Sequence, residues 1–195
     1  PSIPKVTPVG EYAYVFDKLD GSNIRAEWSK KRGFYKFGTR HRLLHHSEPM
    51  LGKAVALIQD KYGSKLEKIF KQENYLKAVC FFEFVGPKSF AGYHVEDDVQ
   101  DVVLFDVDVH KKGLIKPADF ISLFGSLHTA PLLHYGLVDD ELVLKVRTGT
   151  LLGVTFEGVV GKLADGSMFK VKSLAWLEKL KLKCGDNVQT FEELA

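Results

Sequence analysis

The sequence predicts an α+β fold with largely antiparallel sheets flanked by helices. Segments in which apolar and polar residues alternate, as they do in strands, outnumber the segments with helical spacing. Asp-Gly pairs at 20–21 and 165–166 each lie between two strand-like segments, where a tight turn is expected. No repeat or low-complexity linker interrupts the 195 residues, so a single domain over 1–195 is predicted.

The first half of the chain combines strands with two short helices. Alternating or continuous apolar residues predict four strands, at 11–16, 22–28, 33–38 and 76–86. Between the third and fourth strands the apolar spacing becomes helical over 51–62, with Ser47 and Pro49 just upstream as start signals. Gly63 is expected to end this helix, and a second, shorter helix follows through Phe70.

The second half begins with another apolar strand at 101–110. A helix is predicted at 116–127, because Pro117 is tolerated in the first turn and apolar residues gather on one face. A strand, an Asp-Gly turn and a second strand are predicted within 156–173.

Two more helices complete the prediction. The segment 139–147 is typical of a helix, with Asp139 or Asp140 as the N-terminal cap. The last helix is amphipathic and carries its apolar face at three leucines, Leu174, Leu177 and Leu180.

Composition excludes several classes of protein. Hydrophobic residues make up 45% and charged residues 27%, as in ordinary globular proteins, and the formal net charge of +2 alone does not indicate nucleic-acid binding. Only Cys80 and Cys184 are present, so no disulfide framework is expected, and Cys80 lies in an apolar segment that predicts a buried thiol. No membrane span or signal peptide is found, and the cytoplasm is the expected location.

Charged residues stand at unusual places in these elements. Lys18 ends a predicted strand in KLDG, and Glu83 interrupts the apolar VCFFEFVG. Lys170 and Lys172 alternate in FKVKS, so both point to one face of a strand. Arg40 and Glu157 are also candidates. Any one of these residues, taken alone, fits an ordinary surface or paired side chain. Only their order along the chain suggests a shared functional site.

That order resembles the covalent nucleotidyltransferase superfamily of ATP-dependent ligases and capping enzymes, and most closely its RNA ligases. KLDG matches the nucleotidyl-lysine motif at Lys18, and the following GSN matches the RNA ligase form at Asn23. The other matches are GTR at Arg40, FFEFVG at Glu83, LFDV at Phe105, EGVVGK at Glu157, and FKVKS at Lys170 and Lys172. GPKSFAGYH resembles a continuation seen in phage ligases. Six motifs in order over about 14–173 make the resemblance specific.

The resemblance implies a nucleotidyltransferase (ligase adenylation-domain) fold and an ATP-dependent RNA ligase. In this chemistry the Lys18 amine attacks the α-phosphorus of ATP, pyrophosphate leaves, and AMP stays covalently on Lys18. The AMP then passes to an RNA 5′-phosphate, and a 3′-hydroxyl displaces it to join the ends. A lysine is nucleophilic only when uncharged, and nearby cations and a metal ion favour that form.

The matched positions carry the implied roles. Lys170, Lys172 and Arg40 would supply positive charge to the phosphates. Glu83 would bind the ribose hydroxyls, and Phe105 would stack on adenine. Mg²⁺ or Mn²⁺ would be held by two oxygen-bearing side chains, Glu157 and Asn23.

A basic segment with aromatic residues is expected to bind the RNA backbone. WSKKRGFYKFGTRHR contains six cations, Lys30, Lys31, Arg32, Lys36, Arg40 and Arg42. Phe34 and Tyr35 lie among them, and this pattern fits a surface that follows a nucleic-acid strand. The alternative is an ordinary solvated hairpin.

Two other patterns are weaker. His41 and His45 lie four residues apart, as zinc ligands on a helix can, but a solvated or phosphate-facing role is preferred. Asp106 and Asp108 alternate on one strand, and a pair on a sheet face is preferred over a metal site.

The chain departs from the larger ligases after Ser173, because the remaining segment is too short for an OB-fold or a helical accessory domain. A catalytic core alone is therefore expected. It would act as a monomer on RNA, including nicked duplex, and would have no membrane partner. If the protein is viral, its expected location is the host-cell cytoplasm. The alternatives are a minimal DNA ligase, a GTP-dependent capping enzyme, or a non-catalytic nucleotide- or RNA-binding module.

Overall fold

The computed structural model describes residue 3 and residues 7–45, 47–48, 51–86 and 99–184. These residues divide into two compact units, unit 1 from the described parts of 1–20 and 130–195, and unit 2 from those of 21–89 and 94–129. Within the described parts of the chain, the helices are too short or too polar to cross a membrane. The matched continuation GPKSFAGYH lies almost wholly outside the described residues.

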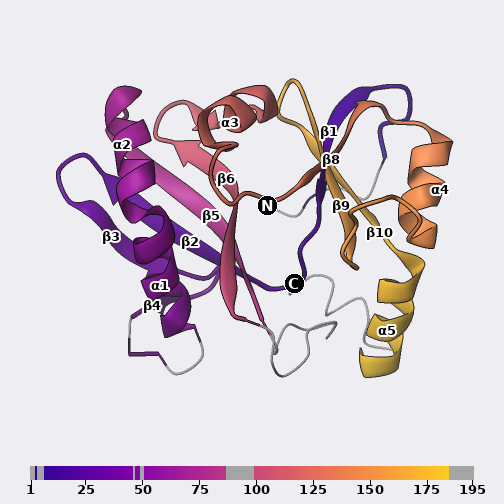
Figure 1. The fold of residues 1–195 in the computed structure, drawn as a ribbon, viewed down its shortest axis with the longest axis horizontal. Helices are drawn as coiled ribbons and strands as arrows, with labels where there is room; N and C mark the ends of the chain where they lie inside the picture. The colour runs from indigo at the N-terminus through magenta and orange to yellow at the C-terminus, as the bar shows by residue number, and fades with distance from the viewer. Residues whose placement is uncertain (1–2, 4–6, 46, 49–50, 87–98, 185–195) are drawn as a thin grey trace. The chain divides into compact units, whose positions relative to one another are not determined.

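Unit 1 is built on a four-stranded antiparallel sheet in the order β10-β9-β1-β8 (Figure 1). The strands are β1 (Tyr12–Asp17), β8 (Leu132–Leu137), β9 (Gly158–Leu163) and β10 (Met168–Lys172). One face carries Ala13, Val15, Val159, Phe169 and Val171, which pack with apolar residues of α4 (Asp140–Thr148) into a core. The opposite face carries Lys162 of β9 and Lys170 and Lys172 of β10.

Local signals fix the ends of the unit 1 elements. Asp139 caps α4, because its Oδ1 accepts a hydrogen bond from the Leu142 backbone N–H at 2.7 Å. The turn between β9 and β10 is the predicted Asp-Gly turn, in which Asp165 Oδ1 accepts from Ser167 N–H at 2.8 Å and Gly166 has φ +95°. The last helix, α5 (Leu174–Cys184), turns Leu180 inward.

Unit 2 contains a six-stranded sheet in the order β4-β3-β2-β5-β6-β7, with every neighbouring pair antiparallel. Its strands are β2 (Ser22–Ser29), β3 (Gly33–Gly38), β4 (Leu43–Leu44), β5 (Lys77–Val85), β6 (Asp101–Val109) and β7 (Gly113–Leu114). The α+β prediction with largely antiparallel sheets is confirmed.

Helices cover one face of the unit 2 sheet. They are α1 (Gly52–Ile58), α2 (Ser64–Gln72) and α3 (Pro117–Phe124). Trp28 and Phe82 from the strands, Phe70 from α2 and Phe124 from α3 are fully buried in one core. Because residues alternate along a strand, the polar residues of β2 and β5 lie on the other face.

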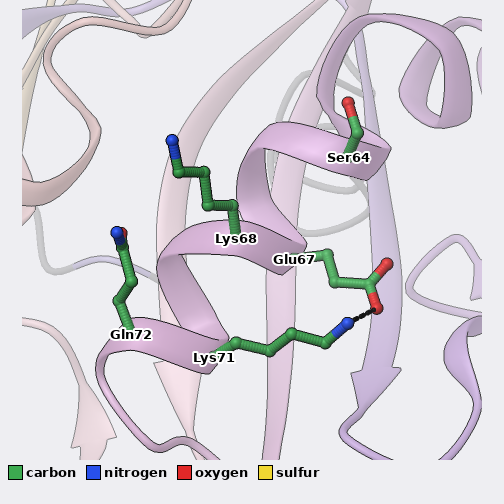
Figure 2. Close-up of a pocket in the computed structure, with 5 residues that line it drawn as sticks. All are labelled: Ser64, Glu67, Lys68, Lys71 and Gln72. Atoms are coloured by element: carbon green, nitrogen blue, oxygen red, sulfur yellow. Dashed lines mark ion pairs between the residues drawn. The ribbon is translucent and has the colours of Figure 1, made fainter.

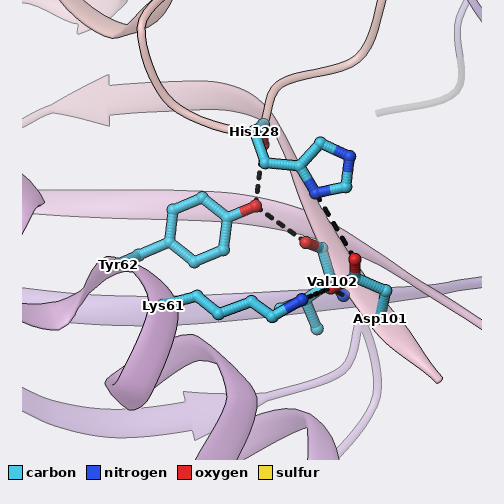
Figure 3. A network of polar contacts seen from close by, with 5 residues as sticks. All are labelled: Lys61, Tyr62, Asp101, Val102 and His128. Carbon is cyan, nitrogen blue, oxygen red and sulfur yellow. Dashed lines mark hydrogen bonds and ion pairs between the residues drawn. The ribbon is translucent and has the colours of Figure 1, made fainter. Parts of the chain in front are cut away.

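The predicted break at Gly63 is wrong. A π-helix, Gln59–Gly63, joins α1 to α2 without interruption. Its wider turn places Tyr62 in the core, with the hydroxyl 2.7 Å from two carbonyl oxygens, of Val102 and of His128 (Figure 3). The preceding Lys61 forms an ion pair with Asp101 at 2.6 Å, so this helix is tied to β6.

Other predictions also need correction. The Asp-Gly pair at 20–21 does not form a hairpin, because β1 pairs within the unit 1 sheet and β2 within the unit 2 sheet. Strand β8 was not predicted, and most of its side chains are exposed or half-buried. Leu174 is 52% exposed, so it does not belong to the buried face of α5, where Trp176 lies instead.

A shallow polar hollow lies on the outer surface of α2. Its lining includes Lys68 and the ion pair between Lys71 and Glu67 at 2.7 Å, spaced one helical turn apart (Figure 2). These exposed side chains are typical of a solvated helix face and are not part of the candidate active site.

Candidate active site

Lys18 follows directly after β1 and is fixed to the start of β9. Its backbone N–H donates to the Gly158 carbonyl at 2.9 Å. Gly158 has φ +136°, and a Cβ there would lie 2.1 Å from the Val171 carbonyl oxygen of β10. Only glycine allows this close approach of three backbone segments, so EGVVGK needs its first glycine to position Lys18.

Lys18 and Lys172 bind the same carboxylate. Lys18 Nζ lies 2.8 Å from Glu157 Oε2, and Lys172 Nζ lies 3.3 Å from Glu157 Oε1. The side chains of Glu157 and Lys172 are only 6% and 9% exposed, whereas Lys18 is 24% exposed. The cluster is therefore largely shielded from water, and Lys18 is the member most accessible to a ligand.

A tryptophan and a serine support this cluster. The Lys172 ammonium lies 3.7 Å from the centre of the Trp176 ring, a close cation–π contact. Ser173 Oγ donates to the Phe156 carbonyl at 2.6 Å and accepts from the backbone N–H of Trp176 at 3.1 Å. Ser173 N–H donates to the Glu157 carbonyl at 3.0 Å. These bonds fix the start of α5 next to Glu157.

More lysines share this face of the unit 1 sheet. Lys170 and Lys172 alternate with Phe169 and Val171 as predicted, and Phe169 and Val171 point into the core. Lys162 lies on the same face of β9 and is 5% exposed, with its ammonium 5.2 Å from the centre of the Phe16 ring. We did not single out Lys162 from the sequence, although alternation along EGVVGK could have placed it on this face.

Asp17 holds the segment before β9 against the end of β1. Its Oδ1 accepts from the Thr155 N–H at 3.0 Å, and its Oδ2 accepts from the Thr155 hydroxyl. Burial raises the pKa of this carboxyl, the two Thr155 bonds lower it in part, and the nearby charge of Glu157 raises it further. Asp17 and Thr155 therefore position the residues next to Lys18 and Glu157. No sequence signal joined these two residues.

Thr155→Val is expected to reduce stability in a pH-dependent way. The hydroxyl bond favours the ionised carboxylate, so its loss raises the folded-state pKa of Asp17 further. Unfolding in urea at pH 7 should show a loss of about 1 kcal/mol. The loss should shrink as pH falls through the raised folded-state pKa of Asp17, because below it the carboxyl is protonated in the folded wild-type protein and in the folded variant alike.

The matched control is Thr148→Val, because the Thr148 hydroxyl donates to the Leu144 carbonyl at 2.8 Å and touches no carboxylate. Its effect should not change with pH. An equal loss at pH 4 and pH 7 in Thr155→Val would contradict the role assigned to the Asp17 carboxylate.

Three other predicted site residues lie together in unit 2. Asn23 and Glu83 are direct cross-strand partners on β2 and β5. Phe105 sits at a bulge of β6, with its ring centre 6.3 Å from that of Phe81. All lie on the sheet face opposite the helix-covered core, because Ile24 and Phe82 next to them point into that core.

The predicted basic segment is partly neutralised. Lys36 Nζ lies 2.8 Å from Glu27, and Arg42 lies 3.2 Å from Glu48. Burial opposes ionisation of Glu27, but bonds from Lys36 and Tyr35 lower the pKa of this carboxyl overall. Arg32 lies 5.4 Å from the centre of the Tyr35 ring. Lys30, Lys31, Arg32 and Arg40 are exposed, and Arg40 lies in the turn after β3.

The weaker metal hypotheses find no support among the described residues, which contain no group of three or more His, Cys, Asp or Glu side chains able to hold a metal ion. The strand β4 separates His41 from His45, so the two do not share a helix face. Asp106 and Asp108 lie on one sheet face, and Asp106 is 5% exposed. Cys80 is fully buried, and burial raises the pKa of its thiol.

The unit 1 cluster fits a phosphate-bearing substrate. Two lysines, Lys18 and Lys172, share one carboxylate, and Lys162 and Lys170 lie on the same sheet face, so this face is rich in cations suited to a polyphosphate. Glu157 offers one carboxylate. Magnesium is commonly held by one or two carboxylates together with waters and substrate phosphates, so this donor set fits a divalent cation that arrives with its nucleotide.

Comparison with known families matches the RNA ligase family over residues 11–177. Similar solved structures include mutants of Naegleria gruberi RNA ligase with ATP and Mn (TM-score 0.67) and with AMP and Mn (TM-score 0.66); each is 22% identical, over 91% of this chain and 58% of that chain. Naegleria gruberi RNA ligase with PPi has a TM-score of 0.65 and 24% identity, over 88% of this chain and 52% of that chain.

Identity at this level supports a shared fold, which agrees with the predicted adenylation-domain architecture. The chain spans a little over half the length of these solved structures. A comparison with curated proteins finds no match.

Proposed function

Because the chain belongs to the RNA ligase family, we propose that it joins RNA ends in an ATP-dependent reaction that passes through a lysyl-AMP and an adenylated RNA. The observation that carries this proposal is the Glu157 carboxylate, with Lys18 at 2.8 Å on one oxygen and Lys172 at 3.3 Å on the other. A partly exposed amine next to an almost buried charge cluster is suited to nucleophilic attack on a bound phosphate.

In the first step Lys18 Nζ gives up its proton to water and attacks the α-phosphorus of ATP. The new bond joins nitrogen to phosphorus, the bond between the α-phosphorus and the bridging oxygen breaks, and pyrophosphate leaves with the electron pair. In the second step an RNA 5′-phosphate oxygen attacks the phosphorus of the AMP, the nitrogen–phosphorus bond breaks, and Lys18 Nζ keeps the electron pair and takes a proton from water. In the third step a 3′-hydroxyl oxygen attacks the 5′-phosphorus, a phosphodiester forms, and AMP leaves.

Lys172 and Lys170 are proposed to bind the phosphates in these steps. Lys172 is held by Glu157 and by the Trp176 ring, so its charge is fixed in place before any ligand arrives. A preorganised cation stabilises the charge that develops in a phosphoryl-transfer transition state without further rearrangement. Arg40 is proposed to add a further charge from unit 2.

Glu157 is proposed to exchange its partner during the reaction. Its carboxylate contacts the Lys18 nitrogen at 2.8 Å, and this contact must open before the nitrogen can attack a phosphate. Mg²⁺ or Mn²⁺ bound by Glu157, and by Asn23 as a second ligand, would neutralise charge on the phosphates. A cation held by Glu157 would also compete with Lys18 for this carboxylate, and Lys18 Nζ would then be available for attack.

The remaining proposed roles belong to unit 2. Glu83 is proposed to accept hydrogen bonds from the ribose hydroxyls, and Phe105 to stack on adenine. The exposed cations of the basic segment are proposed to bind the RNA backbone. The proposed substrate is RNA with 5′-phosphate and 3′-hydroxyl ends, including nicked duplex, and the chain is proposed to act as a monomeric nucleotidyltransferase core over 1–195.

Incubation with labelled nucleotides tests the proposal. With ATP and Mg²⁺ the protein should acquire a covalent label that survives denaturation, and the labelled protein should pass its AMP to 5′-phosphorylated RNA. ATP should label far better than GTP. Preferred labelling by GTP would replace the proposal with a capping activity, and transfer to DNA but not RNA would indicate a DNA ligase. Absence of any label would favour a non-catalytic module.

A further inference from the structure

An aromatic surface extends from the reactive lysine along the unit 1 sheet. It consists of Tyr12, Tyr14, Tyr135 and Leu137, which we name the tyrosine surface. Tyr12 pairs with Leu137, and Tyr14 pairs with Tyr135, across β1 and β8. Tyr12 is 62% exposed and Tyr135 is 59% exposed. The ring centres of Tyr14 and Tyr135 lie 4.3 Å apart, so the two tyrosines form a continuous aromatic surface.

The packing of unit 1 does not account for these side chains. The core contacts of β1 come from Ala13 and Val15, which point to the opposite face and are fully buried. Exposed single apolar residues are common, but adjacent exposed aromatic residues on neighbouring strands typically mark a binding surface. Tyrosine in particular combines a flat apolar ring with a hydroxyl that stays hydrated.

The same face leads directly to the proposed catalytic lysine. Tyr12, Tyr14 and Phe16 point to one side of β1, and Lys18 follows. At about 3.3 Å per residue, Tyr12 lies about 20 Å from Lys18 along the chain, roughly the length of six stacked nucleotides. Lys162 is the cross-strand partner of Tyr14, and its ammonium lies over the Phe16 ring on the same face.

We propose that the tyrosine surface binds single-stranded RNA by base stacking, and that the occupant is the strand whose 5′-phosphate receives AMP. This inference rests on the proposed ligase function. Aromatic side chains stack on any base, so the contact suits an enzyme that must accept many sequences. The 5′-phosphate strand is favoured as the occupant because it alone must meet the AMP on Lys18 in the second step, before the other end is needed.

Binding and strand length test this inference. The double variant Tyr12→Ala/Tyr135→Ala is compared with Tyr12→Phe/Tyr135→Phe, which keeps the rings, and with Leu144→Ala, which removes a 61%-exposed leucine from α4. Fluorescence anisotropy with a 5′-phosphorylated 12-nucleotide RNA should show affinity about 10- to 100-fold weaker in the alanine variant. The salt dependence should stay the same, because no cation is removed. The phenylalanine variant and Leu144→Ala should bind like the wild-type protein.

The second readout is single-turnover transfer of AMP from the pre-labelled protein to 5′-phosphorylated RNA of 2 to 12 nucleotides. In the wild-type protein transfer should improve with length up to about six nucleotides, whereas the alanine variant should lose this dependence. Unchanged RNA affinity and length dependence in the folded alanine variant would overturn the inference. The same result with a change in oligomeric mass would identify the surface as a protein interface instead.

Failure of the proposed function gives a different pattern. Labelling of the wild-type protein by ATP uses no RNA and is measured first. If the wild-type protein takes no label, the proposed function fails. If it is labelled and transfers AMP, but the tyrosine variants bind RNA normally, only the tyrosine surface is wrong.

Discussion

Lys18→Ala is expected to gain no mass when it is incubated with ATP and Mg²⁺, whereas the wild-type protein gains the mass of one AMP. The methyl side chain offers no nucleophile, so the nitrogen–phosphorus bond cannot form. The wild-type adduct should be removed by acid or hydroxylamine, as expected of a phosphoramidate. Intact mass spectrometry followed by peptide mapping measures both the gain and its position.

Two controls separate lost chemistry from lost structure. Lys18→Arg keeps a cation that can bind Glu157, but a guanidinium stays protonated and cannot attack, so it too should gain no mass. Lys53→Ala removes an exposed lysine of α1 and should be labelled like the wild-type protein. An AMP adduct that persists in folded Lys18→Ala would show that another residue is the nucleophile.

Lys18→Ala is also expected to remain folded. The Glu157 carboxylate keeps its second ion pair, with Lys172 at 3.3 Å, so the substitution does not leave a buried charge alone. Replacing Glu157 is more disruptive, because it removes one ion pair from each of two lysines in a site where Lys172 is 9% exposed. Each variant therefore needs its thermal unfolding measured next to its activity.

Sequence patterns predicted most of the strands. Apolar and polar residues alternate along a strand when one face of its sheet is buried, and this alternation can be read locally. β2, β5 and β6 each place apolar residues in one core. The patterns failed where local signals were weak or were overridden. Most β8 side chains stay exposed or half-buried, so apolar and polar residues do not alternate clearly along this strand. The π-helix continues through Gly63 because Tyr62 is then buried and its hydroxyl binds backbone carbonyls.

The sequence predicts those parts of the candidate site that lie within short, continuous motifs. KLDG and EGVVGK mark Lys18 and Glu157, and strand alternation places Lys170 with Lys172. Alternation does not predict that Lys18 and Glu157 are in contact, since that contact depends on the pairing of β1 with β9. Asp17 and Thr155 are 138 residues apart, so no local pattern could join them. The contact between Trp176 and Lys172 likewise depends on how α5 leaves β10.

The last prediction separates the proposed roles of Lys18 and Glu157. When RNA is supplied already adenylated at its 5′ end, the step that uses Lys18 as a nucleophile is bypassed. Lys18→Ala should therefore retain measurable joining of this RNA to a 3′-hydroxyl strand in the absence of ATP. The assay is a gel that resolves the joined product from the two input strands.

Glu157 should behave differently in the same assay. A ligand of the divalent cation is needed whenever a phosphate is attacked, so both loading and the final displacement depend on it. Glu157→Ala should lose joining of pre-adenylated RNA by about 10²- to 10³-fold, as expected when one group that stabilises transition-state charge is removed. Glu157→Gln keeps the side-chain volume and provides the same test if the alanine variant is unstable.

Lys172→Ala should fall between these two variants, because Lys172 is proposed to face the same phosphate in both reactions but is not the only cation on this sheet face. Lys170 lies two residues away on the same strand and can compensate in part. Equal loss of joining in folded Lys18→Ala and Glu157→Gln would mean that Lys18 also acts in the final displacement. In that case Lys18 would serve as a phosphate-binding cation after its role as the nucleophile.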